Sequence, residues 1–185
     1  MPNNLYIFIE GNDDEYFIKE IVIRRLLPEI NIKPYKYSQK SKKKIRNFIK
    51  SIESMGSNYI FITDFDENDS LEIKKEDVLS EFPFIDGDQL VIVKNEIESW
   101  YIAGINSETG IENECSKDLR KIKVPDDTEN FRKEHFDEII PCSFKDSKID
   151  FLKEILKCFD ISLAKERNDS FNQFVNEFCT IEKCK

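Results

Sequence analysis

The chain has 185 residues, of which 39% are hydrophobic and 35% are charged, and its formal net charge is −9. This length fits one ordinary domain, and the share of apolar residues is enough for a packed core, which excludes global disorder. The acidic balance excludes attraction of nucleic acid by overall charge, so any contact with a polyanion would need a local basic patch or bridging metal ions.

The cysteine content and the N-terminal sequence favour a cytoplasmic protein. The five Cys form no C-x-x-C pair and His135 is the only His, so we expect no structural zinc site and interpret the cysteines as reduced thiols. The first residues, MPNNLYIFIEGNDDE, lack the basic start and long apolar run of a signal peptide. No apolar run approaches the ~18 residues of a membrane span, so we expect no membrane partner.

Strand and helix patterns alternate through the first half of the chain. Short apolar runs bounded by turn residues predict three strands, and alternation at KPYKY predicts a fourth, while apolar residues at helical spacing between them predict helices. The predicted strands are Leu5–Ile9, Lys33–Tyr37, Asn58–Thr63 and Gln89–Lys94, with helices from Asn12 to Pro28, within 38–56 and from Glu96 onward. This order predicts βαβ units in an α/β fold, with a mostly parallel sheet of about four strands flanked by helices.

The second half of the chain is less regular. Periodicity is weak from Ile105 to Ser143, where we expect short helices and one more strand at EIIPC, residues 138–142. The segments SKIDFLKEILKCF and DSFNQFVNEFC have the pattern of amphipathic helices. We therefore expect a single domain with an α/β core at 1–104, an irregular insertion at 105–147, and helices at 148–185 that pack on the core.

Acidic residues follow the predicted strands at the points where the strands end. In a parallel sheet these points share one edge, so the side chains are expected to gather there. The acids are Glu10 after the first strand, Asp14 four residues later, Asp64 and Asp66 at the third strand, and Glu96 and Glu98 after the fourth. Carboxylates so close together repel unless a cation lies among them, and oxygen ligands suit Mg²⁺ or Mn²⁺.

Such ions activate water and stabilise charge at phosphorus during phosphodiester cleavage. Acids after strands are also common as helix caps and solvated loop residues, and capping explains Asp14 about as well as metal binding does. Glu67 and Asp69, beside the D-x-D of Asp64 and Asp66, are interpreted as loop or capping acids.

The segments YIFIEGNDDEYF and YIFITDFDEND resemble the TOPRIM family, which includes domains of topoisomerases, primases, nucleases of the overcoming-lysogenization-defect (OLD) type and small stand-alone proteins. The family pattern is a Glu that ends the first strand and a later apolar strand that ends in D-x-D. NEIESWYIAG and NDSFNQFVNEF are similar to further segments of the OLD-type and stand-alone members. The resemblance covers Leu5 to about Gly104 and the C-terminal helices, and it implies a Rossmann-like fold.

The resemblance also implies roles for individual residues. Glu10 would be the general acid/base or a metal ligand, and Asp64 and Asp66 would be metal ligands. Asp14 would be the second acid that permits a second metal. The remaining implied residues are Glu96 and Glu98 as further ligands and Lys148 as a catalytic lysine, with Lys145 as its alternative.

Two other features bear on nucleic-acid binding. The stretch KYSQKSKKKIRNFIK is the only strongly basic one, and its Lys42, Lys43, Lys44 and Arg46 could contact phosphates or form a solvated helix face. Trp100 could stack on a base, or it could be a core anchor for the helix that follows the fourth strand.

The sequence therefore predicts a Mg²⁺- or Mn²⁺-dependent nuclease that hydrolyses DNA or RNA, with a role in defence against phage or mobile elements by analogy with compact TOPRIM proteins. A non-catalytic nucleic-acid-binding or regulatory subunit is an alternative. It would work beside a separate ATPase, since the chain has no G-x-x-x-x-G-K-[ST] motif. A haloacid-dehalogenase-like phosphatase is disfavoured by Asn68, and a receiver domain by the second Asp at position 66.

Overall fold

The computed structural model describes residues 4–65, 70–106 and 116–179 of the chain. It divides into two compact units, Met1–Val93 with Phe174–Lys185, and Lys94–Gln173. The first unit thus ends its main segment directly after the last strand, whereas the sequence placed the end of the α/β core at residue 104.

The first unit is built on a four-stranded sheet in which all neighbouring strands are parallel. The strands are β1 (Asn4–Ile9), β2 (Asn31–Lys36), β3 (Asn58–Asp64) and β4 (Leu90–Val93). Their order is β2-β1-β3-β4, so β1 and β3 lie in the middle. The register pairs Ile7 with Pro34 on one side and with Ile60 on the other. This confirms the predicted α/β, Rossmann-like fold with its parallel sheet.

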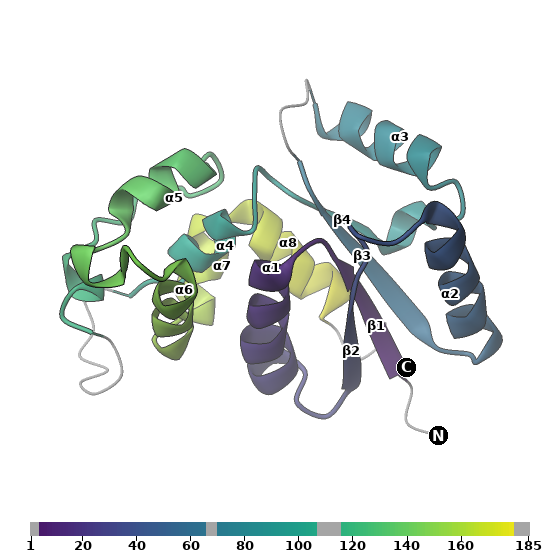
Figure 1. The fold of residues 1–185 in the computed structure, drawn as a ribbon, viewed down its shortest axis with the longest axis horizontal. Coiled ribbons are helices and arrows are strands. Elements are labelled where there is room, and N and C mark those ends of the chain that lie inside the picture. Colours follow the sequence, from purple (N-terminus) through teal and green to yellow (C-terminus); the bar gives the residue numbers. More distant parts are fainter. Residues whose placement is uncertain (1–3, 66–69, 107–115, 180–185) are drawn as a thin grey trace. The chain divides into compact units, whose positions relative to one another are not determined.

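Helices connect the strands on both faces of this sheet (Figure 1). β1 leads into α1 (Asn12–Phe17), which continues as a π-helical segment, Ile18–Leu26, and β2 leads into α2 (Lys42–Ser54). β2 and β3 lie on opposite sides of β1, so right-handed crossovers place α1 and α2 on opposite faces. α3 (Leu71–Glu81) connects β3 to β4 on the face of α2.

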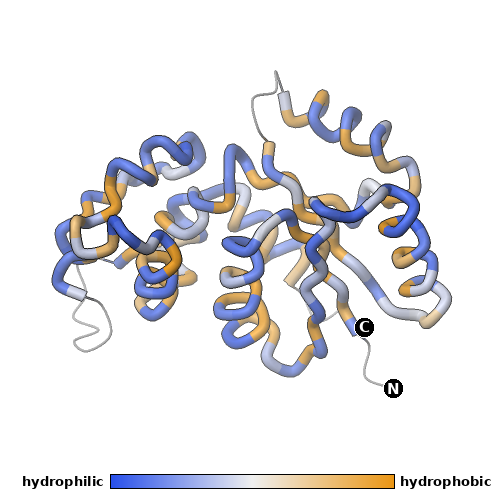
Figure 2. Tube along the Cα trace, in the orientation of Figure 1, coloured by the Kyte–Doolittle hydropathy of each residue, from blue (hydrophilic) through white to orange (hydrophobic). Residues whose placement is uncertain are grey.

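Apolar side chains from one face of the sheet and from one side of α2 pack together in an aromatic-rich core. On one face of the sheet, Phe8 and Phe61 stack with ring centroids 5.7 Å apart. Ile45, Ile49 and Ile52 of α2 pack against this face, because the spacings of four and three residues keep them on one side of the helix. Figure 2 shows the same alternation of hydrophobic and hydrophilic residues along the helices of this unit.

The regular elements in the described part of the second unit are helices, joined by irregular segments and one isolated β-bridge between Ile105 and Phe159. The unit contains α4 (Glu98–Ala103), α5 (Lys133–Ile139), α6 (Lys148–Lys157), α7 (Ile161–Arg167) and the start of α8 (Asp169–Phe178). Every residue of α4 is buried, and the fully buried aromatic side chains include Trp100, Tyr101 and Phe136.

The fifth strand that the sequence suggested at residues 138–142 is not formed, so this prediction is wrong. Ile139 instead ends α5, and a short 3₁₀ turn from Cys142 to Phe144 follows Pro141. Two consecutive Ile in a five-residue segment are too few to distinguish a strand from a helix end, and burial of Phe136 on one side of α5 stabilises the helix.

None of the described helices combines the length and the apolar character that a membrane span requires. Cys142 and Cys179 are free thiols, but Cys158 is disulfide-bonded, so the expectation of reduced thiols is wrong at Cys158. Sequence spacing does not determine which cysteines approach each other in space.

Candidate functional site

The strand order creates a topological switch point between β1 and β3. From β1 the chain first crosses to β2 on one side and then returns to β3 on the other side of β1. Ligands of open α/β sheets bind at such points, beyond the carboxyl ends of the strands. Glu10 follows β1 directly and Asp64 is the last residue of β3, so the two carboxylates belong to the two strands that flank the switch point.

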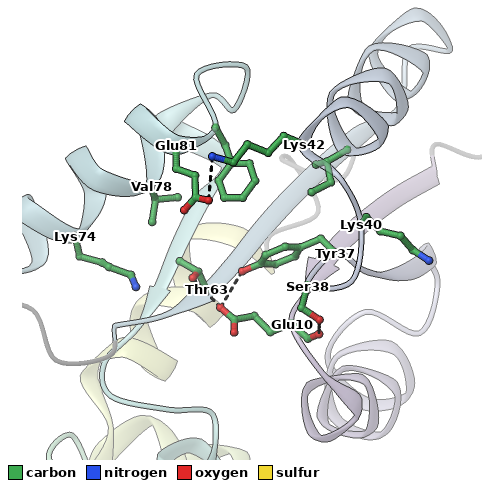
Figure 3. A pocket seen from close by; sticks show the side chains of 11 residues that line it. Glu10, Tyr37, Ser38, Lys40, Lys42, Thr63, Lys74, Val78 and Glu81 are labelled. Atoms are coloured by element: carbon green, nitrogen blue, oxygen red, sulfur yellow. Dashed lines mark hydrogen bonds and ion pairs between the residues drawn. The ribbon is translucent and has the colours of Figure 1, made fainter.

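Glu10 is held at this edge through one carboxylate oxygen. Its Oε1 accepts hydrogen bonds from the Tyr37 hydroxyl and the Thr63 hydroxyl, both at 2.9 Å, and from the Asp64 backbone N–H at 3.4 Å (Figure 3). Among the residues that the structure describes, none hydrogen-bonds to Oε2. One oxygen therefore fixes the carboxylate, and the other is available for chemistry.

Tyr37 is a permanent donor in this arrangement. Its ring is buried and packs on Phe61 with the ring centroids 4.3 Å apart, which fixes the direction of the hydroxyl. Burial raises the pKa of Tyr37 far above its ordinary value, and the negative charges of Glu10 and Asp64 add to the rise. The phenol therefore stays protonated and keeps donating to Glu10.

The other acids predicted around Glu10 have different positions. The charge of Asp64 acts on Tyr37, which places its carboxylate beside the Glu10 cluster. Asp14 is buried, and its Oδ2 accepts the Gly11 backbone N–H at 2.8 Å at the start of α1, which is the capping contact considered from the sequence. Asp66 lies outside the described residues.

Lysines surround Glu10 at this edge. A recess of about 330 Å³ beside Glu10 is lined by Lys40, Lys42 and Lys74, as Figure 3 shows. Lys42 forms an ion pair with Glu81 at 3.1 Å and lies over the Phe82 ring.

Of the four basic residues predicted to contact nucleic acid, only Lys42 lines this recess. Lys43, Lys44 and Arg46 are exposed on α2 and are not among its lining residues.

The acids predicted after the fourth strand belong to the second unit, together with the predicted lysine. Glu98, the first residue of α4, is buried, and its Oε1 lies 2.6 Å from Lys148 Nζ. Lys148 also lies over the Phe136 ring, with its Nζ 5.4 Å from the ring centroid. Lys148, rather than the alternative Lys145, is therefore the lysine that meets one of the predicted acids.

Glu96 precedes α4, as expected from the rule that residues two apart do not share a helix face. Burial raises the pKa of Glu96 and the charge of Glu98 raises it further, while Lys133 opposes the rise through its charge and its backbone N–H.

Trp100 has a structural role. Its side chain is completely buried, and its Nε1 donates a hydrogen bond to the Ser170 hydroxyl at 2.9 Å. Its ring packs edge-on against Phe171. The alternative of stacking on a base is therefore wrong, and the core-anchor interpretation is confirmed.

Glu10 and Asp64 carry carboxylate oxygens, which are ligands that hard divalent cations prefer. Mg²⁺ is commonly bound through one or two carboxylates, with waters and substrate phosphates as its remaining ligands. Within residues 4–65, 70–106 and 116–179, no group of three or more His, Cys, Asp or Glu side chains is arranged to hold a metal ion. Asp64 would supply a ligand to such an ion at this edge, beside the Glu10 carboxylate.

No family model, curated protein or solved structure matches this chain. The TOPRIM resemblance therefore remains a prediction from the residues that carry it.

Proposed function

We propose that this protein is a Mg²⁺- or Mn²⁺-dependent phosphodiesterase that hydrolyses nucleic acid through a TOPRIM-like site. The observation that carries the proposal is the meeting of Glu10 and Asp64 at the switch point, with Glu10 anchored through Oε1. A carboxylate with one fixed and one available oxygen is suited to accept a proton from an attacking water.

Each residue of the edge has a part in this reaction. Asp64 would hold the divalent ion, which when bound neutralises charge that develops at phosphorus and favours ionisation of water. Glu10 Oε2 takes the proton of the attacking water, while Tyr37 and Thr63 keep the carboxylate oriented. The surrounding lysines balance the negative charge of the nucleic-acid backbone.

A metal-dependent cleavage assay tests the proposal. Plasmid, single-stranded DNA and RNA are incubated with Mg²⁺ or Mn²⁺ and with wild type, Glu10→Gln, Asp64→Ala and the control Glu29→Gln. We expect cleavage by wild type and Glu29→Gln, because Glu29 is exposed and outside the site. Loss of the general base in Glu10→Gln should lower the rate by about 10²–10⁴-fold.

Other outcomes would assign the site differently. Equal cleavage by wild type and both site variants, or none by any of them, would remove the hydrolase proposal. Binding without cleavage would favour a regulatory subunit that acts beside an ATPase. Hydrolysis of a phosphomonoester in place of strand cleavage would favour the phosphatase alternative.

A further inference from the structure

Glu10 stands between two recesses. The first, of about 330 Å³, is the one described above, and the second, of about 520 Å³, lies against β2 and the start of α1. Three residues line both recesses and form the ridge between them, namely Glu10, Ser38 and Lys40. Both volumes fall in the range of about 300–1,000 Å³ that is typical of ligand pockets.

Each recess combines an apolar wall with cationic side chains. In the first recess, Phe82 and Val78 form the apolar wall and Lys42 and Lys74 supply the charge. In the second recess, Tyr35 and Pro34 form the wall and Lys36 supplies the charge. An aromatic or apolar surface beside a cation is the combination that binds an unstacked base together with its phosphate.

Lys40 occupies the ridge itself. Lys42 is paired with Glu81, and Lys36 contacts Glu15 at 2.9 Å, so both have carboxylate partners. Lys40 is exposed and forms no ion pair with the residues that the structure describes. In the view of Figure 3, Lys40 lies on one side of Glu10 and Lys74 on the other. Lys40 is therefore the ridge residue that can offer a phosphate a cation without an ion-pair partner among the described residues.

We propose that the two recesses hold successive nucleotides of a single strand, with the linking phosphodiester on the ridge against Lys40 and Glu10. This inference rests on the proposed function and names its substrate as single-stranded nucleic acid. A base can enter such a recess only when it has left its stack, which a duplex opposes.

Hydrolysis across the ridge balances with water as the sole co-reactant. The water oxygen bonds to phosphorus while the bond from phosphorus to one sugar oxygen breaks. The water proton passes to Glu10, and the leaving sugar oxygen takes a proton from solvent. Deoxyribose and ribose strands share this chemistry, so both are included in the test.

Binding is measured in the Glu10→Gln background with EDTA, so that the strand stays intact. Fluorescence anisotropy follows labelled oligodeoxyuridylate, oligouridylate and a DNA duplex of the same length across a salt series. Lys40→Ala is compared with Lys50→Ala, which removes the same charge from an exposed position of α2 outside both recesses.

We expect single strands to bind more tightly than the duplex. Lys40→Ala should weaken single-strand binding several-fold and reduce the slope of log K against log salt by about 0.7, the contribution of one phosphate contact on a single strand. Lys50→Ala should change neither quantity. The preferred sugar is the one whose oligomer binds more tightly.

Equal or tighter binding of the duplex would overturn the inference, as would identical behaviour of Lys40→Ala and Lys50→Ala. These failures differ from failure of the hydrolase. If wild type cleaves nucleic acid but Lys40→Ala binds single strands normally, the assignment of the two recesses is contradicted and the hydrolase proposal stands. If single strands bind in a way that depends on Lys40 but wild type does not cleave them, the assignment of the recesses is supported and the hydrolase proposal is contradicted.

Discussion

The ammonium group of Lys148 lies 2.6 Å from Oε1 of Glu98, although fifty residues separate them in the chain. Glu98 is almost completely buried, and Lys148 retains part of its exposure to water. A buried carboxylate that loses its cation is strongly destabilising, whereas replacement of both partners by uncharged groups often is not. The pair therefore has a stability role that can be measured separately from any catalytic role.

Lys148→Met should lower the free energy of unfolding by about 2 kcal/mol, less than for a fully buried pair because Lys148 keeps contact with water. Adding Glu98→Gln should restore part of this loss, since no buried charge remains. Urea denaturation measures both variants. Lys153→Met on the same helix is the control, because its ion pair is exposed and should contribute under about 0.5 kcal/mol. Equal effects of the two lysine changes would contradict the expectation.

Glu96 should make stability depend on pH. Its pKa is raised, first by burial and then by Glu98, so the folded protein binds this proton more tightly than the unfolded chain does. This contribution is fully present below the unfolded pKa and is lost as pH rises through the folded pKa. The stability of Glu96→Gln relative to wild type should therefore increase with pH in this window.

Urea denaturation of wild type and Glu96→Gln between acidic and neutral pH measures this difference. Glu138→Gln, the same change on an exposed side chain, is the matched control. A relative stability that stays constant or falls as pH rises would show that burial of Glu96 does not disfavour its charged form.

Tyr37→Phe should remove one of the donors that hold Glu10 while leaving the ring in place. The expected loss is about 1.5–3 kcal/mol of unfolding free energy, since one hydrogen bond to a charged partner disappears. Thr63→Val should act similarly, and Thr63→Ser, which retains the hydroxyl, is the control. If cleavage is observed, both losses should lower its rate and Thr63→Ser should not. Unchanged stability in Tyr37→Phe would mean that the hydrogen bond contributes nothing to the fold.

Gly104→Ala should destabilise the second unit. A Cβ at this position would lie 2.3 Å from ring carbons of Phe159, so the ring or the backbone must move. Overpacking of this kind typically costs about 1–3 kcal/mol, and Phe159→Leu in the same chain should recover part of it. Gly87→Ala is the control, because its nearest atom is the flexible end of Lys75 at 3.3 Å. Thermal denaturation that ranks Gly87→Ala as the more damaging change would contradict the steric explanation.

The sheet was predictable because β1, β3 and β4 are short apolar runs and because the residues around β2 alternate between polar and apolar. α3 was not anticipated, and its composition explains why. Only Lys74 and Val78 of this helix are buried, while Leu71 and Ile73 are exposed. An apolar stripe at helical spacing is therefore missing, although the Ser70 hydroxyl accepts the Ile73 N–H as a helix cap.

The proximity of Glu10 and Asp64 was predictable for a geometric reason, since parallel strands end at one edge. Tyr37 and Thr63 were missed as partners of Glu10, because hydrogen bonds between strands depend on register and strand order. A signal was nevertheless present in the sequence. Tyr37 ends the predicted second strand and Thr63 precedes Asp64, so both lie at the same edge as Glu10.

The strand order also gives the Glu10 and Asp64 carboxylates and the second recess different stabilities against local unfolding. Glu10 and Asp64 lie at the ends of β1 and β3, the interior strands. Their backbone amide hydrogens exchange with solvent only when much of the unit opens. The second recess instead rests on β2, an edge strand with Pro34 in its ladder, which can fray without the others. As denaturant is added, the protein should therefore lose its binding of single-stranded nucleic acid at a lower concentration than the one that separates the Glu10 and Asp64 carboxylates.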